Sequence, residues 1–182
     1  MDRARAGDRQ AAEALLVRHE LLIHRTCRQL LPAGEDVEGA VQETFLRALR
    51  GLPGFTGASS VAGWMAAIAV NLCRDRLRRH RLVPFQPLES DDEGEPGGPV
   101  AVVPASDPGP ERVAMARQAV ERVRREVEAL PDRQREAFVL RFHAGMDLDG
   151  IAAALGIDVG TVKTHLHRAV RRVRRVAEEA MP

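Results

Sequence analysis

The side chains with the clearest chemistry lie between positions 158 and 175, where apolar residues recur at helical spacing. One face of the expected helix is apolar and consists of Val162, Leu166, Ala169 and Val173. The groups on or near the opposite face form hydrogen bonds, namely Thr161, Thr164, His167, Arg168, Arg171 and Arg175. The same helix also carries Lys163, His165 and Arg172. Side chains of these types bind phosphates and base edges, so DNA binding is expected of this helix rather than acid–base catalysis.

A shorter apolar helix precedes this segment. Residues 148–155 have helical periodicity, Gly156 supplies a turn, and the next helix is expected to begin near Asp158. Two helices joined by a glycine-containing turn form a helix-turn-helix, whose second helix enters the major groove of duplex DNA. The pattern therefore predicts a duplex-binding motif at residues 148–175.

A second basic surface is expected on the helix at residues 61–81. One stripe of this helix carries Asn71, Arg74, Arg78 and Arg81. Arginines at this spacing can contact successive phosphates or an acidic protein surface. Trp64 and Phe55 lie near the start of the helix, where aromatic rings could stack on unpaired bases. The alternative, in which both rings belong to the core and the arginines are solvated, stays open.

One face of the helix expected at residues 35–52 is polar apart from a single leucine. This face consists of Glu35, Gly39, Gln42, Glu43, Leu46 and Arg50. An exposed leucine among polar groups is typical of a protein-contact surface. A stray exposed leucine on a solvated helix fits the spacing equally well. The opposite, buried face of this helix is expected to include Leu49.

Helical periodicity predicts an all-α fold of two small helical domains joined by a flexible acidic linker. The first domain, residues 1–83, is expected to contain helices at residues 4–31, 35–52 and 61–81, the last with Ser60 as a plausible N-cap. The second, residues 112–182, is expected to contain a helix at 112–129, a helix capped by Asp132, and the helix-turn-helix. The inward face predicted for residues 112–129 carries Val113, Ala116, Val120, Val123 and Val127.

Residues 84–111 differ in composition from both domains and are predicted to be the linker. They carry 7 acidic and 0 basic side chains, whereas residues 1–83 and 112–182 each have a net charge of +4. They are also rich in Pro and Gly. A solvated spacer is the simpler interpretation, although the acidic charge could also shield basic DNA-binding faces.

The sequence gives little support for an enzyme, a metal site or a membrane protein. His19, His24 and Cys27 share an expected helix, but their spacing suits no standard zinc motif. No Gly-rich phosphate loop or nucleophile elbow occurs, and no cofactor is expected. Cys27 and Cys73 imply no disulfide framework. No apolar run approaches a membrane span and no signal-peptide core is present, so a cytoplasmic protein is expected.

Three groups of motifs resemble the bacterial extracytoplasmic-function (ECF) σ factors, a subfamily of the σ70 family. Residues 35–48, EDVEGAVQETFLRA, are similar to the second conserved region. The motif that follows that region is matched by Trp64, Ile68, Ala69, Asn71, Asp75, Leu77 and Arg78. The fourth region is matched by Leu130-Pro131, Gln134-Arg135-Glu136, Leu140-Arg141, Ile151-Ala152, Leu155-Gly156 and residues 160–169. Gly39 and Ala40 depart from the usual Asp and Leu, and Val61 stands where an aromatic residue is common.

The resemblance implies a promoter-specificity factor that has no enzymatic activity. It implies that the clamp of the largest RNA polymerase core subunit binds Asp36, Glu38, Gln42, Glu43 and Leu46. It implies that the promoter −10 element, as a separated strand, is bound by Trp64, Asn71, Arg74 and Arg78. It implies that the −35 element, as duplex, is bound by Thr161, Lys163, Thr164, His165, His167, Arg168, Arg171 and Arg172. An anti-σ factor that covers these faces is also implied.

Two other functions compete with this interpretation. A stand-alone helix-turn-helix transcriptional regulator would bind duplex DNA, would not bind core polymerase, and would give residues 35–50 no special role. An interaction protein would instead bind a protein partner through its acidic linker and the exposed face at Leu46. Binding to core polymerase separates both alternatives from the σ-factor interpretation.

Overall fold

All regular structure in the described part of the chain is helical, as predicted. The computed structural model describes residues 2–82 and 110–180, so the expected linker lies outside the described residues except for its last two positions. The first half contains α1 (Asp2–Arg5), α2 (Arg9–Leu30), α3 (Val37–Gly51), the short 3-10 helix η1 (Leu52–Gly54) and α4 (Val61–Leu82). The second half contains α5 (Pro110–Glu128), α6 (Asp132–Phe142), α7 (Leu148–Leu155) and α8 (Val159–Ala180). Within these two ranges, no helix has both the length and the apolar character needed to cross a membrane.

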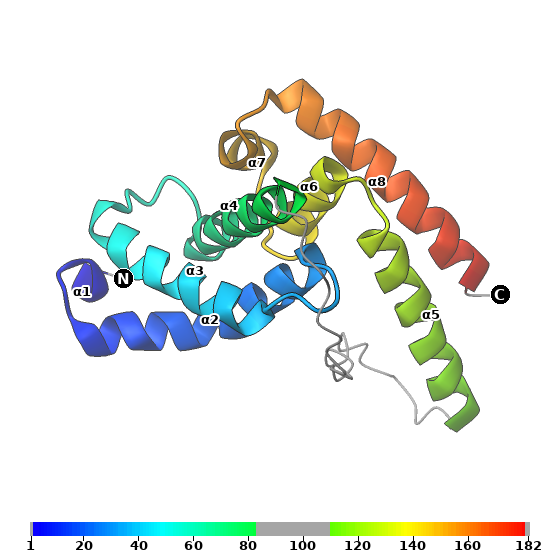
Figure 1. Ribbon diagram of the computed structural model, residues 1–182, viewed down its shortest axis with the longest axis horizontal. Coiled ribbons are helices and arrows are strands. Elements are labelled where there is room, and N and C mark those ends of the chain that lie inside the picture. Colours follow the sequence, from blue (N-terminus) through cyan, green and yellow to red (C-terminus); the bar gives the residue numbers. More distant parts are fainter. Residues whose placement is uncertain (1, 83–109, 181–182) are drawn as a thin grey trace.

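In the first half, α2, α3 and α4 pack against one another (Figure 1). Ile23 of α2, Ala40 of α3 and Met65 of α4 are fully buried members of one apolar cluster. Thr44 is buried beside them, and its hydroxyl donates to the Ala40 carbonyl at 2.7 Å. Each helix thus buries one face in the core and leaves its other face available for contacts.

Side-chain caps fix where α3 and α4 begin. The Asp36 carboxylate accepts a hydrogen bond from the Gly39 N–H at 2.7 Å, and the Ser60 hydroxyl accepts one from the Gly63 N–H at 3.0 Å. The prediction of Ser60 as an N-cap is therefore confirmed. Arg76 of α4 donates to the Asp36 carbonyl at 2.8 Å. This bond ties the first turn of α3 to α4 and fixes the direction in which the outer face of α3 points.

The predicted helix-turn-helix is confirmed in α7 and α8. The Asp147 carboxylate caps α7 by accepting from the Gly150 N–H at 2.8 Å. Gly156 ends α7 with φ of 65°, the left-handed conformation that favours glycine. Asp158 then accepts from the Thr161 N–H at 2.8 Å, and α8 follows. The apolar face of α8 packs inward through the fully buried Val162 and Ala169.

The two halves are in direct contact, which the sequence analysis did not predict. α4 contacts α6 and α7, and α2 contacts α5 and α6. One apolar cluster joins Ile23 and Met65 of the first half to Leu140 and Ile151 of the second. In Figure 1, α4 lies beside α6 and α7 in the middle of the molecule. The two groups of helices therefore share part of their core.

Two predictions about helix ends were wrong. The helix expected at residues 4–31 is interrupted at Gly7, where φ is 91°. Asp8 then begins α2 by accepting from the Ala11 N–H at 3.1 Å. Asp132 is not the N-cap of α6, because Pro131 holds that position. Asp132 is the first helical residue, and its carboxylate accepts from Arg135 at 3.0 Å.

The buried face of α5 is narrower than predicted. Ala116 and Val120 are exposed, and 47% of Val120 is accessible to solvent. Val113 and Val123 are half-buried, and Val127 is buried. α5 packs on α8, but Figure 1 shows its first turns extending away from the other helices. Helical periodicity predicted an apolar stripe correctly but could not show how much of it is covered.

Removal of the Ser60 cap should destabilise the first half. Ser60→Ala is expected to lower the free energy of unfolding by about 1 kcal/mol, because the Gly63 N–H loses its acceptor. Ser59→Ala, at the neighbouring serine, is the matched control, and its free energy of unfolding should stay close to that of the wild type. Urea unfolding followed by circular dichroism measures both variants, and equal effects would contradict the capping role.

Candidate promoter- and polymerase-binding surfaces

The outer face of α8 presents basic and hydrogen-bonding groups to solvent. Among the residues predicted to bind DNA, exposed side chains belong to Lys163, Thr164, His167, Arg168 and Arg171. Thr161 and His165 are half-buried, and Thr161 donates to its capping partner Asp158. Arg172 is turned toward α5, where it pairs with Glu126 at 2.7 Å. Most of the predicted set therefore shares one accessible face, and Arg172 helps to hold α8 on α5.

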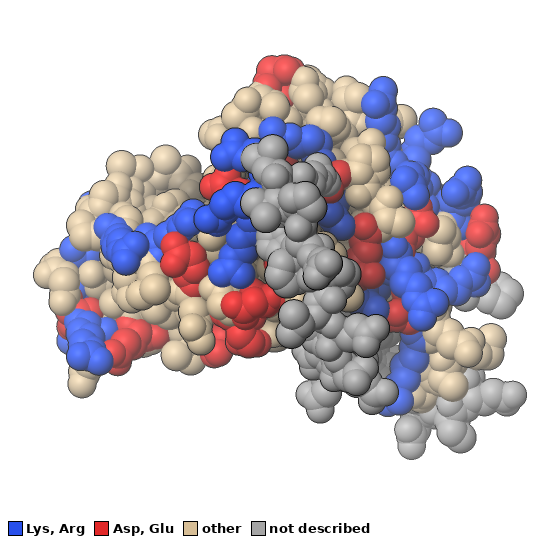
Figure 2. Space-filling view, viewed as in Figure 1, with Lys and Arg blue, Asp and Glu red and all other residues tan. Residues whose placement is uncertain are grey.

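A basic hollow of about 360 Å³ lies between α6 and α8. It is lined by Pro131, Gln134, Arg168, Arg171, Arg172 and Arg175. Figure 2 shows basic side chains gathered over the later turns of α8. Four guanidinium groups around one hollow create a positive potential that favours anionic groups such as DNA phosphates. Gln134 was missed as a candidate because its position depends on how α6 packs on α8.

The outer face of α3 contains more apolar surface than predicted. Gln42 is exposed, and 48% of Leu46 is accessible. Leu49 was expected in the core but is 38% exposed, because it lies three residues after Leu46 at the edge of the same face. Two neighbouring exposed leucines favour a protein-contact surface over a single stray leucine.

Carboxylates surround these leucines and are held by basic partners. Arg47 donates to Glu43 at 2.8 Å, and this hydrogen bond lowers the pKa of Glu43 below its ordinary value. A carboxylate oxygen of Glu38 lies 3.0 Å from the His24 ring nitrogen of α2. With Asp36 at the start of the helix, the face combines fixed negative charge with apolar area, a composition suited to a protein partner.

Phe55 and Trp64 form an aromatic pair between η1 and α4. Their ring centroids are 4.9 Å apart, and the planes are tilted by 44°. Phe55 is buried, so the core interpretation is correct for it, whereas Trp64 is half-buried. A Cβ atom at Gly51 would lie 3.1 Å from the Trp64 ring, so glycine lets the end of α3 approach that ring. Trp64 thus joins α3 to α4 and keeps part of its surface accessible.

The predicted stripe on α4 does not face solvent along its whole length. Arg74 is directed at α6, where its guanidinium donates to both carboxylate oxygens of Glu136 at 2.9 and 2.8 Å. Arg78 is exposed and lies 3.6 Å from Asp75, and Asn71 is half-buried. The side chain of Arg81 lies outside the described residues. Of the two arginines predicted to bind the −10 element, only Arg78 is fully accessible in this arrangement.

Comparison with known proteins identifies the family. Residues 15–83 match the family model described as Sigma-70 region 2, and residues 120–173 match Sigma-70, region 4. The ECF RNA polymerase sigma factor SigM of Mycobacterium tuberculosis is 36% identical over 171 residues, covering 94% of this chain and 79% of that protein. This chain belongs to the ECF σ factors. The ECF RNA polymerase sigma-E factor of Escherichia coli is 31% identical over 173 residues, covering 93% of this chain and 87% of that protein.

Solved structures share the fold of this σ factor. One is CnrH in complex with the cytosolic domain of CnrY, with a TM-score of 0.64, 24% identity, and coverage of 98% of this chain and 94% of that chain. Another is the σ factor RpoE in complex with the anti-σ factor NepR from Bartonella quintana, with a TM-score of 0.62, 23% identity, and coverage of 93% and 95%.

The family assignment decides between the functions that the sequence left open. A stand-alone helix-turn-helix regulator leaves the region 2 match unexplained, and that match covers the exposed α3 face. σ factors direct transcription initiation and do not catalyse a reaction of their own. Within the residues that the structure describes, no group of three or more His, Cys, Asp or Glu side chains could hold a metal ion.

Truncation of Trp64 should destabilise this σ factor. Trp64→Ala is expected to lower the free energy of unfolding by about 3 kcal/mol, the lower end for an aromatic core truncation, because the ring is only half-buried. Trp64→Phe keeps a ring against Phe55, so its free energy of unfolding should fall much less. Urea unfolding distinguishes them, and a Trp64→Ala variant as stable as the wild type would show that the ring does not support the fold.

Proposed function

We propose that the outer face of α3 docks on the clamp of the largest RNA polymerase core subunit. The residues assigned to this contact are Asp36, Glu38, Gln42, Glu43 and Leu46. Support comes from the exposure of Gln42 and Leu46, and Leu49 extends the same apolar area. Leucines surrounded by polar groups form the hydrophobic centre and polar rim that protein interfaces use.

The first half would also hold the separated strand of the −10 element. Trp64, Asn71, Arg74 and Arg78 are assigned to this contact. The half-exposed Trp64 ring offers a stacking surface to an unpaired base, and the exposed Arg78 offers a phosphate contact. Arg74 would have to exchange the carboxylate of Glu136 for a phosphate. These two groups suit single-stranded DNA, because bases expose their faces for stacking only after the strands separate.

The second half would bind the −35 element as duplex, with α8 in the major groove. Base edges would be contacted by Thr161, Lys163, Thr164, His165, His167 and Arg168. Arg171 and Arg172, which line the hollow between α6 and α8, would contact phosphates. The observation that carries the proposal is the capped helix-turn-helix with an accessible basic face, on the same chain as the exposed α3 surface.

The domain division proposed from the sequence, residues 1–83, 84–111 and 112–182, gives these contacts a thermodynamic basis. Each domain would bind its own element weakly. Core polymerase would hold the domains at a fixed separation. Once one domain has bound its promoter element, the other domain is therefore at a high effective concentration near its own element. Promoter selection then depends on both elements together.

An anti-σ factor is a further proposed partner. Two solved structures of this fold are complexes, and one of them contains a σ factor with a named anti-σ factor. The exposed leucines of α3 and the basic face of α8 provide surfaces that such a protein could cover. Cytoplasmic localisation, where polymerase and DNA are found, follows from the same proposal.

Substitution on α3 should weaken polymerase binding without weakening DNA binding. Leu46→Glu is expected to reduce affinity for core polymerase about tenfold or more, because it places a charge at the centre of the apolar area, and Gln42→Ala should have a smaller effect. Leu21→Glu on α2, where leucine is 60% exposed, is the matched control. Fluorescence titration of labelled protein with core polymerase measures all three, and equal losses for Leu46→Glu and Leu21→Glu would contradict the assignment.

Substitution on α8 should weaken −35 recognition. Arg168→Ala is expected to reduce affinity for the cognate −35 duplex by roughly 5- to 100-fold, the range for one lost base contact. Arg174→Ala removes an exposed arginine that pairs with Glu178 and serves as the control. Promoters selected with reconstituted holoenzyme supply the duplex. If Arg168→Ala, Gln42→Ala and Leu46→Glu all leave transcription from that promoter unchanged, these residue assignments are wrong.

A further inference from the structure

Arg172 differs from the other three arginines around the hollow between α6 and α8. Its Nε donates to a carboxylate oxygen of Glu126 at 2.7 Å, and its Nη1 donates to the Ala129 carbonyl at 3.4 Å. Glu126 lies in the last turn of α5, and Ala129 directly follows that helix. Within the described residues, a carboxylate partner is lacking for the other three arginines, namely Arg168, Arg171 and Arg175. The fold therefore fixes the guanidinium of Arg172 and leaves its neighbours to solvent.

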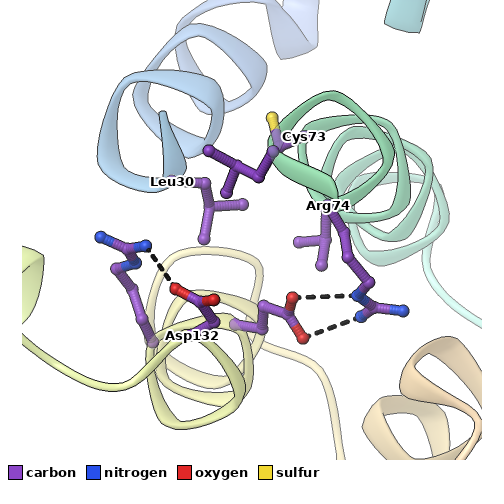
Figure 3. A pocket seen from close by; sticks show the side chains of 8 residues that line it. Leu30, Cys73, Arg74 and Asp132 are labelled. Carbon is purple, nitrogen blue, oxygen red and sulfur yellow. Dashed lines mark hydrogen bonds and ion pairs between the residues drawn. The ribbon is translucent and has the colours of Figure 1, made fainter. Parts of the chain in front are cut away.

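The contacts with α5 occupy only one edge of the Arg172 guanidinium. A guanidinium has five N–H donors in a rigid fork. The Nη2 group of Arg172 makes no hydrogen bond within the part of the chain that the structure describes. Arg74 is held differently, because both carboxylate oxygens of Glu136 bind it, one at Nε and one at Nη2 (Figure 3). Arg172 lines the hollow and keeps 41% of its side chain accessible, so it can bind an anion there without leaving Glu126.

The carboxylate that holds Arg172 stands on a closely packed part of α5. The Glu126 side chain is 17% exposed. The next residue, Val127, is buried in one apolar cluster with Leu130 and with Ala169 of α8. A partner fixed in this way limits the rotamers of the arginine, as packed and hydrogen-bonded supporting residues do in other binding sites. Glu126 can therefore set the direction of the Arg172 guanidinium.

We propose that Glu126 is a positioning residue for the −35 element. It holds Arg172 so that the Nη2 edge of the guanidinium is presented in the hollow, where it binds a DNA phosphate. Glu126 touches the arginine and not the DNA. The inference rests on the proposed function, in which Arg172 contacts a phosphate of the −35 duplex.

Two opposing effects decide whether Glu126 strengthens or weakens DNA binding. Without Glu126, the long Arg172 side chain becomes ordered only on binding, which lowers affinity by a factor of about 10 to 30. Repulsion between an exposed carboxylate and DNA changes affinity by about fivefold or less, and salt screens it. Positioning is the larger effect, so Glu126 should strengthen binding although it carries the same charge as DNA.

Two substitutions at position 126 separate positioning from charge. Glu126→Gln keeps an oxygen acceptor for the Arg172 Nε and removes the charge, whereas Glu126→Ala removes both. Reconstituted holoenzyme is titrated into a fluorescent duplex with the −35 element of a promoter selected with holoenzyme. Glu126→Gln should bind as tightly as the wild type or up to about fivefold more tightly. Glu126→Ala should bind at least about twofold more weakly than the wild type.

Glu178→Ala is the matched control, because Glu178 pairs with Arg174, which does not line the hollow. Its affinity for the duplex should equal that of the wild type.

The salt dependence of binding provides a readout that a purely structural ion pair would not change. Arg172→Gln should lower the slope of log affinity against log salt concentration by about 0.9, the value for one lost phosphate contact. In the Glu126→Ala background, Arg172→Gln should have little further effect on slope or affinity, because the contact is already weakened. Urea unfolding followed by circular dichroism shows that each variant is folded at the temperature of the titration.

The outcomes separate this inference from the proposed function. Equal affinities for Glu126→Gln and Glu126→Ala would overturn the positioning role. An equal effect of Arg172→Gln with and without Glu126 would overturn it as well, and the −35 assignment of α8 would stand in both cases. If the wild-type holoenzyme binds the −35 duplex no more tightly than a scrambled duplex, the proposed function is wrong and the positioning role is wrong with it.

Discussion

The ion pair between Arg74 and Glu136 is the constraint on which the arrangement of the two halves depends. A buried carboxylate must be paired, because loss of its partner costs about 3–5 kcal/mol. The halves can therefore close in only one register, with α6 against α4 at Arg74. Intact buried ion pairs, however, add little net stability over the hydrated ions. The pair thus specifies the register of α6 on α4 more than it stabilises the fold.

The same constraint divides the surfaces of the σ factor into available and covered ones. The leucines of α3 and the basic face of α8 stay accessible, whereas Arg74 on α4 is occupied. In this arrangement the α3 face is open to a protein partner, whereas Arg74 is paired with Glu136. Under the proposed function, polymerase sets the separation that the two DNA contacts need.

Local patterns predicted much of this molecule, because helices, turns and caps depend on residues near one another in sequence. The apolar spacing of α8, the turn at Gly156 and the cap at Ser60 are local in this sense, and all three are present. The break at Gly7 was missed because a glycine within a helical pattern is also tolerated in a continuous helix. The exposure of Val120 and Leu49 was missed because periodicity defines an apolar stripe but not what covers it.

The contact between the halves could not be predicted from the sequence, since Arg74 and Glu136 lie on helices whose patterns give no sign of pairing. Energy transfer between fluorophores on Ala14→Cys and Ala153→Cys, both at exposed positions in opposite halves, tests the central claim most directly because Cys27 and Cys73 are buried and stay unlabelled. Transfer should be high in the wild type and should fall in Arg74→Glu, because that substitution places a carboxylate against the buried Glu136. Transfer that is low in the wild type, or equal in the wild type and Arg74→Glu, would contradict the account.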